Sequence, residues 1–106
     1  SHHPKLRFTV DVIAQLPAAV SPEHAALFTA LEESTLEATG FEPPRTAAGP
    51  ANEGYLLIER GIPTVCGFGA HGANAHAPDE YVEIDSLIET ALIYALTAVK
   101  LDEGVA

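Results

Sequence analysis

The stretch GIPTVCGFGAHGANAHAPDEYVEIDSLIETALIYA, residues 61–95, decides the fold. It opens with a mostly apolar run over 62–68 that contains β-branched residues, a composition typical of a strand buried on both faces of a parallel sheet. Residues 69–80 follow and are rich in glycine, alanine and polar groups. Open α/β sheets bind their ligands in loops at the carboxyl ends of such strands. We therefore expect a ligand site in the loop 69–80.

The end of this stretch predicts a long helix that begins near Asp85 or Ser86. Ser86 followed by Glu89 matches a capping box, in which both side chains satisfy backbone N–H groups of the first turn. Its apolar residues occur on more than one face: Leu87, Ile88, Ala91, Leu92, Ile93, Ala95, Leu96, Ala98 and Val99. A helix of this kind is expected to be covered by neighbours on more than one side.

Upstream of the stretch, a helix is predicted over residues 22–39. Ser21 is a favoured N-cap residue, and Gly40 can adopt the left-handed conformation that ends a helix. A short second helix is predicted over 54–60, where Asn52 can cap its start. The chain thus alternates helical and extended segments, which predicts the α/β class.

The beginning of the chain has a different pattern. Residues 6–14, LRFTVDVIA, alternate between apolar side chains (Leu6, Phe8, Val10, Val12) and polar ones (Arg7, Thr9, Asp11). This alternation predicts an antiparallel strand with one buried and one solvated face. The change of pattern between residues 14 and 21 indicates a structural boundary.

Charge and composition argue against several classes of protein. The 106 residues contain 5 Lys and Arg against 15 Asp and Glu, a formal net charge of −10 that disfavours binding to nucleic acid or an anionic membrane surface. No apolar run approaches the roughly 18–20 residues of a membrane span. The single cysteine, Cys66, excludes an internal disulfide and fits a reducing compartment. These features predict a cytoplasmic protein that acts on something small.

The loop 69–80 carries the residues best suited to chemistry: His71, Asn74, His76, Asp79 and Glu80. Histidine and carboxylate side chains bind zinc through nitrogen and oxygen, although such residues in a loop are also commonly solvated. Cys66 lies within the predicted buried strand, which favours a core thiol over a nucleophile. We assign no catalytic residue from these patterns.

The order of Gly61-Ile62-Pro63, a glycine-rich loop, His76-Ala77-Pro78-Asp79-Glu80-Tyr81-Val82 and a long helix resembles a known family. It is similar to the C-terminal part of the dinuclear-zinc aminoacylases and carboxypeptidases, which include acetylornithine deacetylase, succinyl-diaminopimelate desuccinylase and glutamate carboxypeptidases. The resemblance implies the C-terminal part of a zinc-exopeptidase-like three-layer αβα domain. Residues 1–16 would be the last strand of the lid (dimerisation) domain and a linker, and residues 17–106 a portion of the catalytic domain.

The resemblance also implies a metal centre. His76 would be a metal ligand, and the substrate-binding residues would be Asn52, Glu53, Gly69, His71 and Asn74. Asn52 and Glu53 stand where many members have a serine- or threonine-aspartate-glycine segment. An intact active site would hold two zinc ions, or cobalt or manganese in their place. The remaining ligands and the glutamate base come from an N-terminal half with an H-x-D motif, which this sequence lacks.

Two functions from different classes follow. In the first, the chain is the C-terminal segment of a metal-dependent hydrolase that cleaves the amide bond of N-acyl amino acids or small peptides through a zinc-bound water. Its partners are the N-terminal remainder of the same enzyme and a second copy, and the chain alone is expected to be inactive. The absence of methionine agrees with a part of a longer protein. In the alternative, the chain is a stand-alone, non-catalytic acidic α/β module acting by protein–protein association, for example by pairing residues 6–14 between copies.

Overall fold

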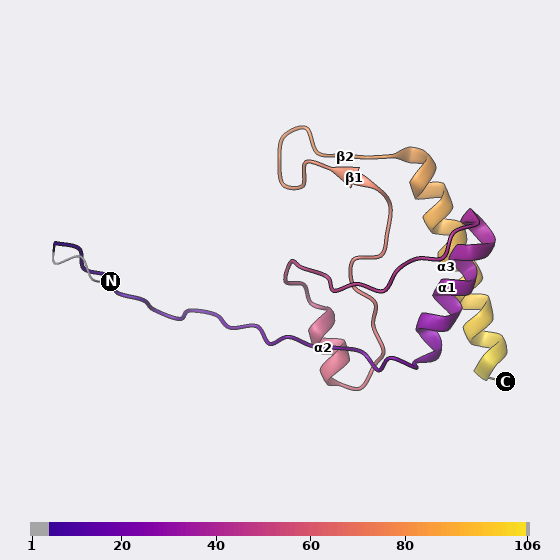
Figure 1. Ribbon diagram of the computed structural model, residues 1–106, viewed down its shortest axis with the longest axis horizontal. Coiled ribbons are helices and arrows are strands. Elements are labelled where there is room, and N and C mark those ends of the chain that lie inside the picture. The colour runs from indigo at the N-terminus through magenta and orange to yellow at the C-terminus, as the bar shows by residue number, and fades with distance from the viewer. Residues whose placement is uncertain (1–4, 106) are drawn as a thin grey trace.

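The computed structural model describes residues 5–105, without the side chain of Val105, so residues 1–4 of the predicted lid segment lie outside the described residues. The elements are α1 (Ala26–Thr39), α2 (Gly54–Glu59), β1 (Gly72–Ala73), β2 (Tyr81–Val82) and α3 (Ile84–Val105). Figure 1 shows an extended N-terminal arm, a middle part with α2 and the two strands, and a helix pair. This mixture of helices and a small antiparallel sheet is consistent with the predicted α/β class.

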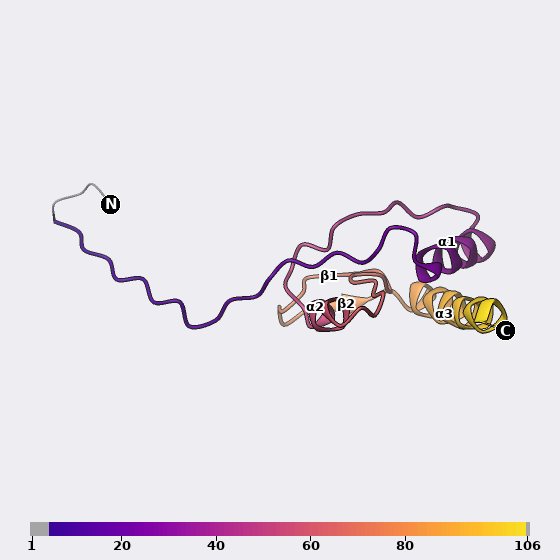
Figure 2. The ribbon, with the colours of Figure 1, turned by 90° about the horizontal axis from the view of Figure 1, so that it is seen from below.

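The core of the described chain lies between α1 and α3, which run side by side in both views (Figures 1 and 2). The buried apolar residues of the described part are Ala30 and Leu31 of α1 and Ile93 of α3. Small hydroxyl residues, Ser34, Thr35 and Thr97, complete this interface. Because these side chains are short, the two helix backbones can approach closely and exclude water with little apolar volume.

Buried hydroxyl groups in this interface are satisfied within their own helices, with one exception. Thr35 donates to the carbonyl of Leu31 at 2.7 Å, and Thr97 donates to the carbonyl of Ile93 at 2.7 Å. The Oγ of Ser34 is fully buried and has no hydrogen-bond partner. A buried, unpaired hydroxyl costs free energy because its hydration is lost without replacement.

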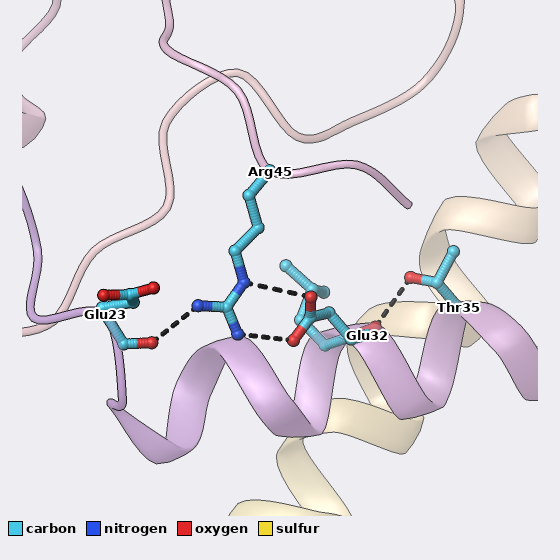
Figure 3. A network of polar contacts seen from close by, with 5 residues as sticks. Glu23, Glu32, Thr35 and Arg45 are labelled. Atoms are coloured by element: carbon cyan, nitrogen blue, oxygen red, sulfur yellow. Dashed lines mark hydrogen bonds and ion pairs between the residues drawn. The ribbon is translucent and has the colours of Figure 1, made fainter. Parts of the chain in front are cut away.

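Ion pairs on the surface of the helix pair connect α1 to α3 and to the segment that follows α1. Lys100 of α3 reaches Glu37 of α1 at 2.9 Å, and this hydrogen bond raises the pKa of the lysine. Arg45, beyond the end of α1, contacts both carboxylate oxygens of Glu32 at 3.0 and 2.6 Å and donates to the carbonyl of Glu23 (Figure 3). The paired guanidinium lowers the pKa of Glu32. The arginine thereby holds the segment that follows α1 against the side of that helix.

The predicted buried strand over 62–68 is not formed, and these residues run irregularly beside the helix pair. A strand needs hydrogen bonds to a neighbouring strand, and none of the described segments lies at that position. Residues 62–68 are held instead by hydrogen bonds from Thr64 to Ser21. The Ser21 hydroxyl donates to the carbonyl of Thr64 and accepts from the N–H of Thr64, both at 2.8 Å. Ser21 therefore does not cap a helix, and α1 begins later, at Ala26.

The predicted antiparallel strand over 6–14 is likewise not formed. These residues leave the body of the molecule as an arm (Figures 1 and 2) and form no hydrogen bond with the rest of the described chain. The alternation of side chains is present, but no described strand pairs with these residues. The arm therefore remains exposed.

Coverage of α3 also differs from the prediction. The helix begins at Ile84, and one side of it packs on α1 through Ile93 and Thr97. Leu92 and Val99 remain about half exposed because no described element lies against that side.

None of the helices among residues 5–105 combines the length and the apolar character that a membrane span requires.

Candidate functional site

The candidate site is built on the hairpin formed by β1 and β2. The strands pair antiparallel, with Gly72 opposite Val82 and Ala73 opposite Tyr81. The residues between the strands, 74–80, form the loop at the tip of the hairpin (Figure 1). A side chain at position 72 would overlap the carbonyl oxygen of Tyr81, so the close approach of the strands requires glycine.

Backbone conformation singles out Asn74 and His76 in the tip loop. They have φ angles of 62° and 65° and are the non-glycine residues of the described chain with positive φ. Asparagine and histidine tolerate this left-handed region better than most residues, yet it still costs free energy. Two turns hold the loop, with hydrogen bonds from Ala77 N–H to the Asn74 carbonyl and from Glu80 N–H to the Ala77 carbonyl. Backbone strain of this kind clusters at functional sites.

The hairpin is anchored to the beginning of α3 through the backbone of His71. The N–H of His71 donates to Ser86 Oγ at 2.8 Å, and its carbonyl accepts from the N–H of Glu83 at 2.8 Å. Ser86 also donates to the carbonyl of Glu83 at 2.7 Å. Ser86 is therefore a link between hairpin and helix rather than the predicted cap. This link fixes the base of the hairpin while leaving the His71 side chain exposed.

His76 fits the role of a single metal ligand. Its side chain is exposed and forms no hydrogen bond or ion pair with any described residue, so either ring nitrogen is free to bind a ligand. A divalent metal is bound by neutral imidazole through such a nitrogen. Among residues 5–105, no group of three or more histidine, cysteine, aspartate or glutamate side chains is placed to hold a metal ion. The described residues can thus supply one ligand here but cannot complete a metal site.

The predicted site residues divide into two groups. Gly69, His71, Asn74 and His76 lie on the hairpin or directly before it. Asn52 and Glu53 instead precede α2, which Figure 1 shows at the opposite end of the middle part. There the Asn52 side chain accepts a hydrogen bond from the N–H of Gly54 at 2.8 Å, which helps to start the short helix.

Sequence reasoning missed Tyr94 as a support of the segment that leads to the hairpin. Its hydroxyl donates to the carbonyl of Phe68 at 2.5 Å, and the two rings are 6.2 Å apart. Gly69 lies next to this contact. A Cβ atom at position 69 would lie at an ordinary van der Waals distance from the Tyr94 hydroxyl. A hydroxyl within the otherwise apolar run 91–96 was the available signal.

The described chain has a hollow at the hairpin and a second one at the helix pair. A shallow one of about 340 Å³ lies against the hairpin and is lined by Ala70, Gly72, Ala73, Ala75, Glu80, Tyr81 and Val82. An apolar groove of about 390 Å³ lies against the helix pair and is lined by Leu27, Leu31, Leu57, Ile62, Pro63, Thr64, Val65, Phe68, Tyr94, Thr97, Ala98 and Leu101. The small side chains of the first hollow leave the backbone accessible beside the tip loop.

Comparison with known proteins produced one match. The model of peptidase family M20/M25/M40 matches residues 6–100, which include the arm, the hairpin and most of α3. No curated protein and no solved structure gave a significant match to the sequence.

Proposed function

The chain belongs to peptidase family M20/M25/M40, and from this membership we propose that it contributes to a metal-dependent hydrolase. The reaction is cleavage of the amide bond in N-acyl amino acids or small peptides, as in the dinuclear-zinc acylases and carboxypeptidases that the motif around His76 resembles. The observation that carries the proposal is an exposed, unpartnered imidazole on a left-handed backbone at the tip of a hairpin within the matched residues.

In this proposal residues 17–106 form the C-terminal portion of the catalytic domain, of the three-layer αβα type. Residues 1–16 belong to the lid domain. The apolar groove and the exposed side of α3 are then surfaces against which the rest of the enzyme packs. Such packing would also supply the neighbouring strands that residues 6–14 and 62–68 lack here.

His76 would hold one metal ion, zinc or alternatively cobalt or manganese, and residues outside the described part would provide the other ligands. Metals bound in such a site lower the pKa of a water molecule and stabilise the oxyanion of amide hydrolysis. The strained turns at Asn74 and His76 define the backbone conformation from which the imidazole projects, and the anchor at Ser86 attaches the base of the hairpin to α3. This preorganisation reduces the ordering that metal binding must impose on the loop.

Recognition of the substrate falls to the surface beside the tip loop. Asn74 can donate and accept hydrogen bonds through its amide, and His71 can do so through its ring. The hollow against the hairpin is lined by the chain neighbours of these two residues, Ala70, Gly72, Ala73 and Ala75. The amide group of a small acylated amino acid can form hydrogen bonds with the side chains of both Asn74 and His71.

Replacing His76 tests the proposal in the intact enzyme that contains this chain. We expect His76→Ala to lose about one metal ion per active site, measured by mass spectrometry of the metal content. Turnover of N-acetylated amino acids should fall at least about a hundredfold. His24→Ala is the matched control because His24 is also exposed and has no described partner, but lies away from the hairpin. Normal metal content together with normal turnover in His76→Ala would refute the ligand assignment.

The second candidate is a non-catalytic acidic module that acts by association with another protein. The specific observation in its favour is the apolar surface that the described chain exposes, including the groove beside the helix pair. The two candidates differ in a simple assay. In the intact protein that contains this chain, hydrolysis of acylated amino acids that depends on added zinc supports the enzyme, whereas metal-independent association without any hydrolysis supports the module.

A further inference from the structure

The ladder of the hairpin continues one pair beyond its two strands, to the beginning of α3. Its last regular pair on this side is Gly72 with Val82, and the same register places His71 opposite Glu83. In an antiparallel ladder, a hydrogen-bonded pair exchanges two bonds, in which each N–H donates to the carbonyl of the opposite residue. One of these bonds is direct, since the N–H of Glu83 donates to the carbonyl of His71 at 2.8 Å.

The reciprocal bond of this pair passes through Ser86. The N–H of His71 donates to Ser86 Oγ at 2.8 Å, and the Ser86 hydroxyl donates to the carbonyl of Glu83 at 2.7 Å. The same carbonyl accepts the N–H of Leu87 at 3.2 Å, which begins the hydrogen bonding of α3. A carbonyl oxygen has two lone pairs and can accept both bonds. The Ser86 hydroxyl therefore completes the ladder at the residue where the helix takes over.

This bridge determines how the hairpin is oriented relative to α3. The direct bond between Glu83 and His71 alone would leave the hairpin free to rotate about that bond, whereas a second bond beside it fixes the direction. The hairpin has two regular pairs, and a two-stranded hairpin of this kind is only marginally stable by itself. In contrast, α3 has 22 residues and packs on α1 through Ile93. The helix is thus the rigid body to which the bridge attaches the hairpin.

We propose that Ser86 is a positioning residue for the metal ligand His76. The inference rests on the proposed function, since it takes His76 to be a ligand. The His76 ring lies in the tip loop of the hairpin, so the direction in which the hairpin leaves α3 decides where the ring meets the other ligands. Ser86 is 9% exposed, and its hydroxyl is occupied by the two backbone bonds. It therefore acts through the backbone of His71 and contacts neither metal nor substrate.

Hydrogen exchange without metal tests the bridge itself. In the metal-free form of the intact enzyme that contains this chain, Ser86→Ala should speed exchange of the amides in 71–83 at least about tenfold, because local opening of the hairpin becomes easier. Thr39→Val is the matched control. The Thr39 hydroxyl links the end of α1 to the following segment in the same way, accepting from the N–H of Phe41 at 3.1 Å and donating to the carbonyl of Thr35 at 2.8 Å. This variant should leave exchange in 71–83 unchanged.

Zinc binding tests the positioning role. In the same enzyme, competition with a chelator should show that Ser86→Ala raises the dissociation constant of one zinc ion at least about tenfold. Ser86→Thr should stay within about threefold of the original enzyme, because threonine keeps a hydroxyl that can bond the carbonyl three positions earlier in a helix. Thr39→Val, which loses a comparable pair of hydrogen bonds away from the hairpin, should also stay within about threefold.

His76→Ala, measured alongside, separates this inference from the proposed function. If His76→Ala loses a zinc ion while Ser86→Ala binds zinc as the original enzyme does, only the role of Ser86 is wrong. If His76→Ala binds zinc normally, the ligand assignment is wrong, and the role of Ser86 falls with it. Unchanged exchange in 71–83 in Ser86→Ala would overturn the bridge. Zinc binding in Ser86→Thr as weak as in Ser86→Ala would also overturn the proposal, because the hydroxyl would not be the group that matters.

Discussion

The helix pair and the arm both carry sequence patterns that predict a covered apolar face, but only the helix pair has one. On α3, Ile93 is 3% exposed because α1 lies against it, whereas Val10, on the apolar face of the arm, is 85% exposed. A helix satisfies the hydrogen bonds of its backbone internally, so α1 and α3 need each other only to cover side chains. A strand depends on a neighbour for its hydrogen bonds, and the described chain provides none for the arm. Periodicity therefore indicates that a face will be covered without identifying what covers it.

The largest expected difference between the two regions follows from truncating one residue of the predicted apolar face in each. Ile93→Ala should lower the free energy of unfolding by about 2–4 kcal/mol, because it removes a buried side chain and leaves a cavity between the helices. Val10→Ala should change it by less than about 0.5 kcal/mol, because Val10 is 85% exposed. Urea unfolding followed by circular dichroism measures both. Similar losses at the two positions would show that the arm packs against the body of the molecule in solution.

A smaller effect of opposite sign is expected at Ser34, whose hydroxyl is buried in the helix interface without a partner. Ser34→Ala removes the unpaired hydroxyl and should leave stability unchanged or raise it by up to about 1 kcal/mol. Ser34→Leu should destabilise the pair by about 1–3 kcal/mol because the closely packed interface has no room for it. A loss above about 1 kcal/mol in Ser34→Ala would mean that the hydroxyl has a partner in solution.

The smallest effect concerns pH. Because Arg45 lowers the pKa of Glu32 in the folded chain, the pair stabilises the fold above the ordinary carboxyl pKa and loses this contribution as pH falls through the lowered value. Arg45→Ala should therefore reduce the fall in urea midpoint between about pH 6 and pH 3. Arg60→Ala serves as the control, since Arg60 donates to the carbonyl of Leu56 and forms no ion pair with a carboxylate of the described residues. An identical pH dependence in Arg45→Ala and the original chain would contradict the assignment.

Local signals predicted the helices well. The observed α1 and α2 lie inside the predicted ranges, and α3 begins one residue before the predicted start. The two serines predicted as caps show the limit of this reasoning. A serine hydroxyl can satisfy any nearby backbone group, and tertiary contacts direct Ser21 to Thr64 and Ser86 to His71.

The candidate site was predictable to the extent that it is local in sequence. Asn74 and His76 share one loop, so a motif that places them in the sequence also places them together in space. Asn52 and Glu53 were expected at the same site, but their position depends on how α2 packs, and α2 contributes no fully buried side chain that would fix it near the hairpin. The strand predicted at 62–68 is absent for the same physical reason as the strand predicted in the arm: no described strand lies beside it.

The contact between α1 and α3 has a consequence for folding kinetics. Glu37 and Lys100, which join the two helices, are separated by 63 positions in the chain. The segment between the helices must close into a long loop, and lose conformational entropy, before the buried contacts between the helices can stabilise it. Loop closure of this kind slows folding. We therefore expect this helix pair to fold more slowly than helical bundles with short connections, at rates closer to those of mixed α/β domains.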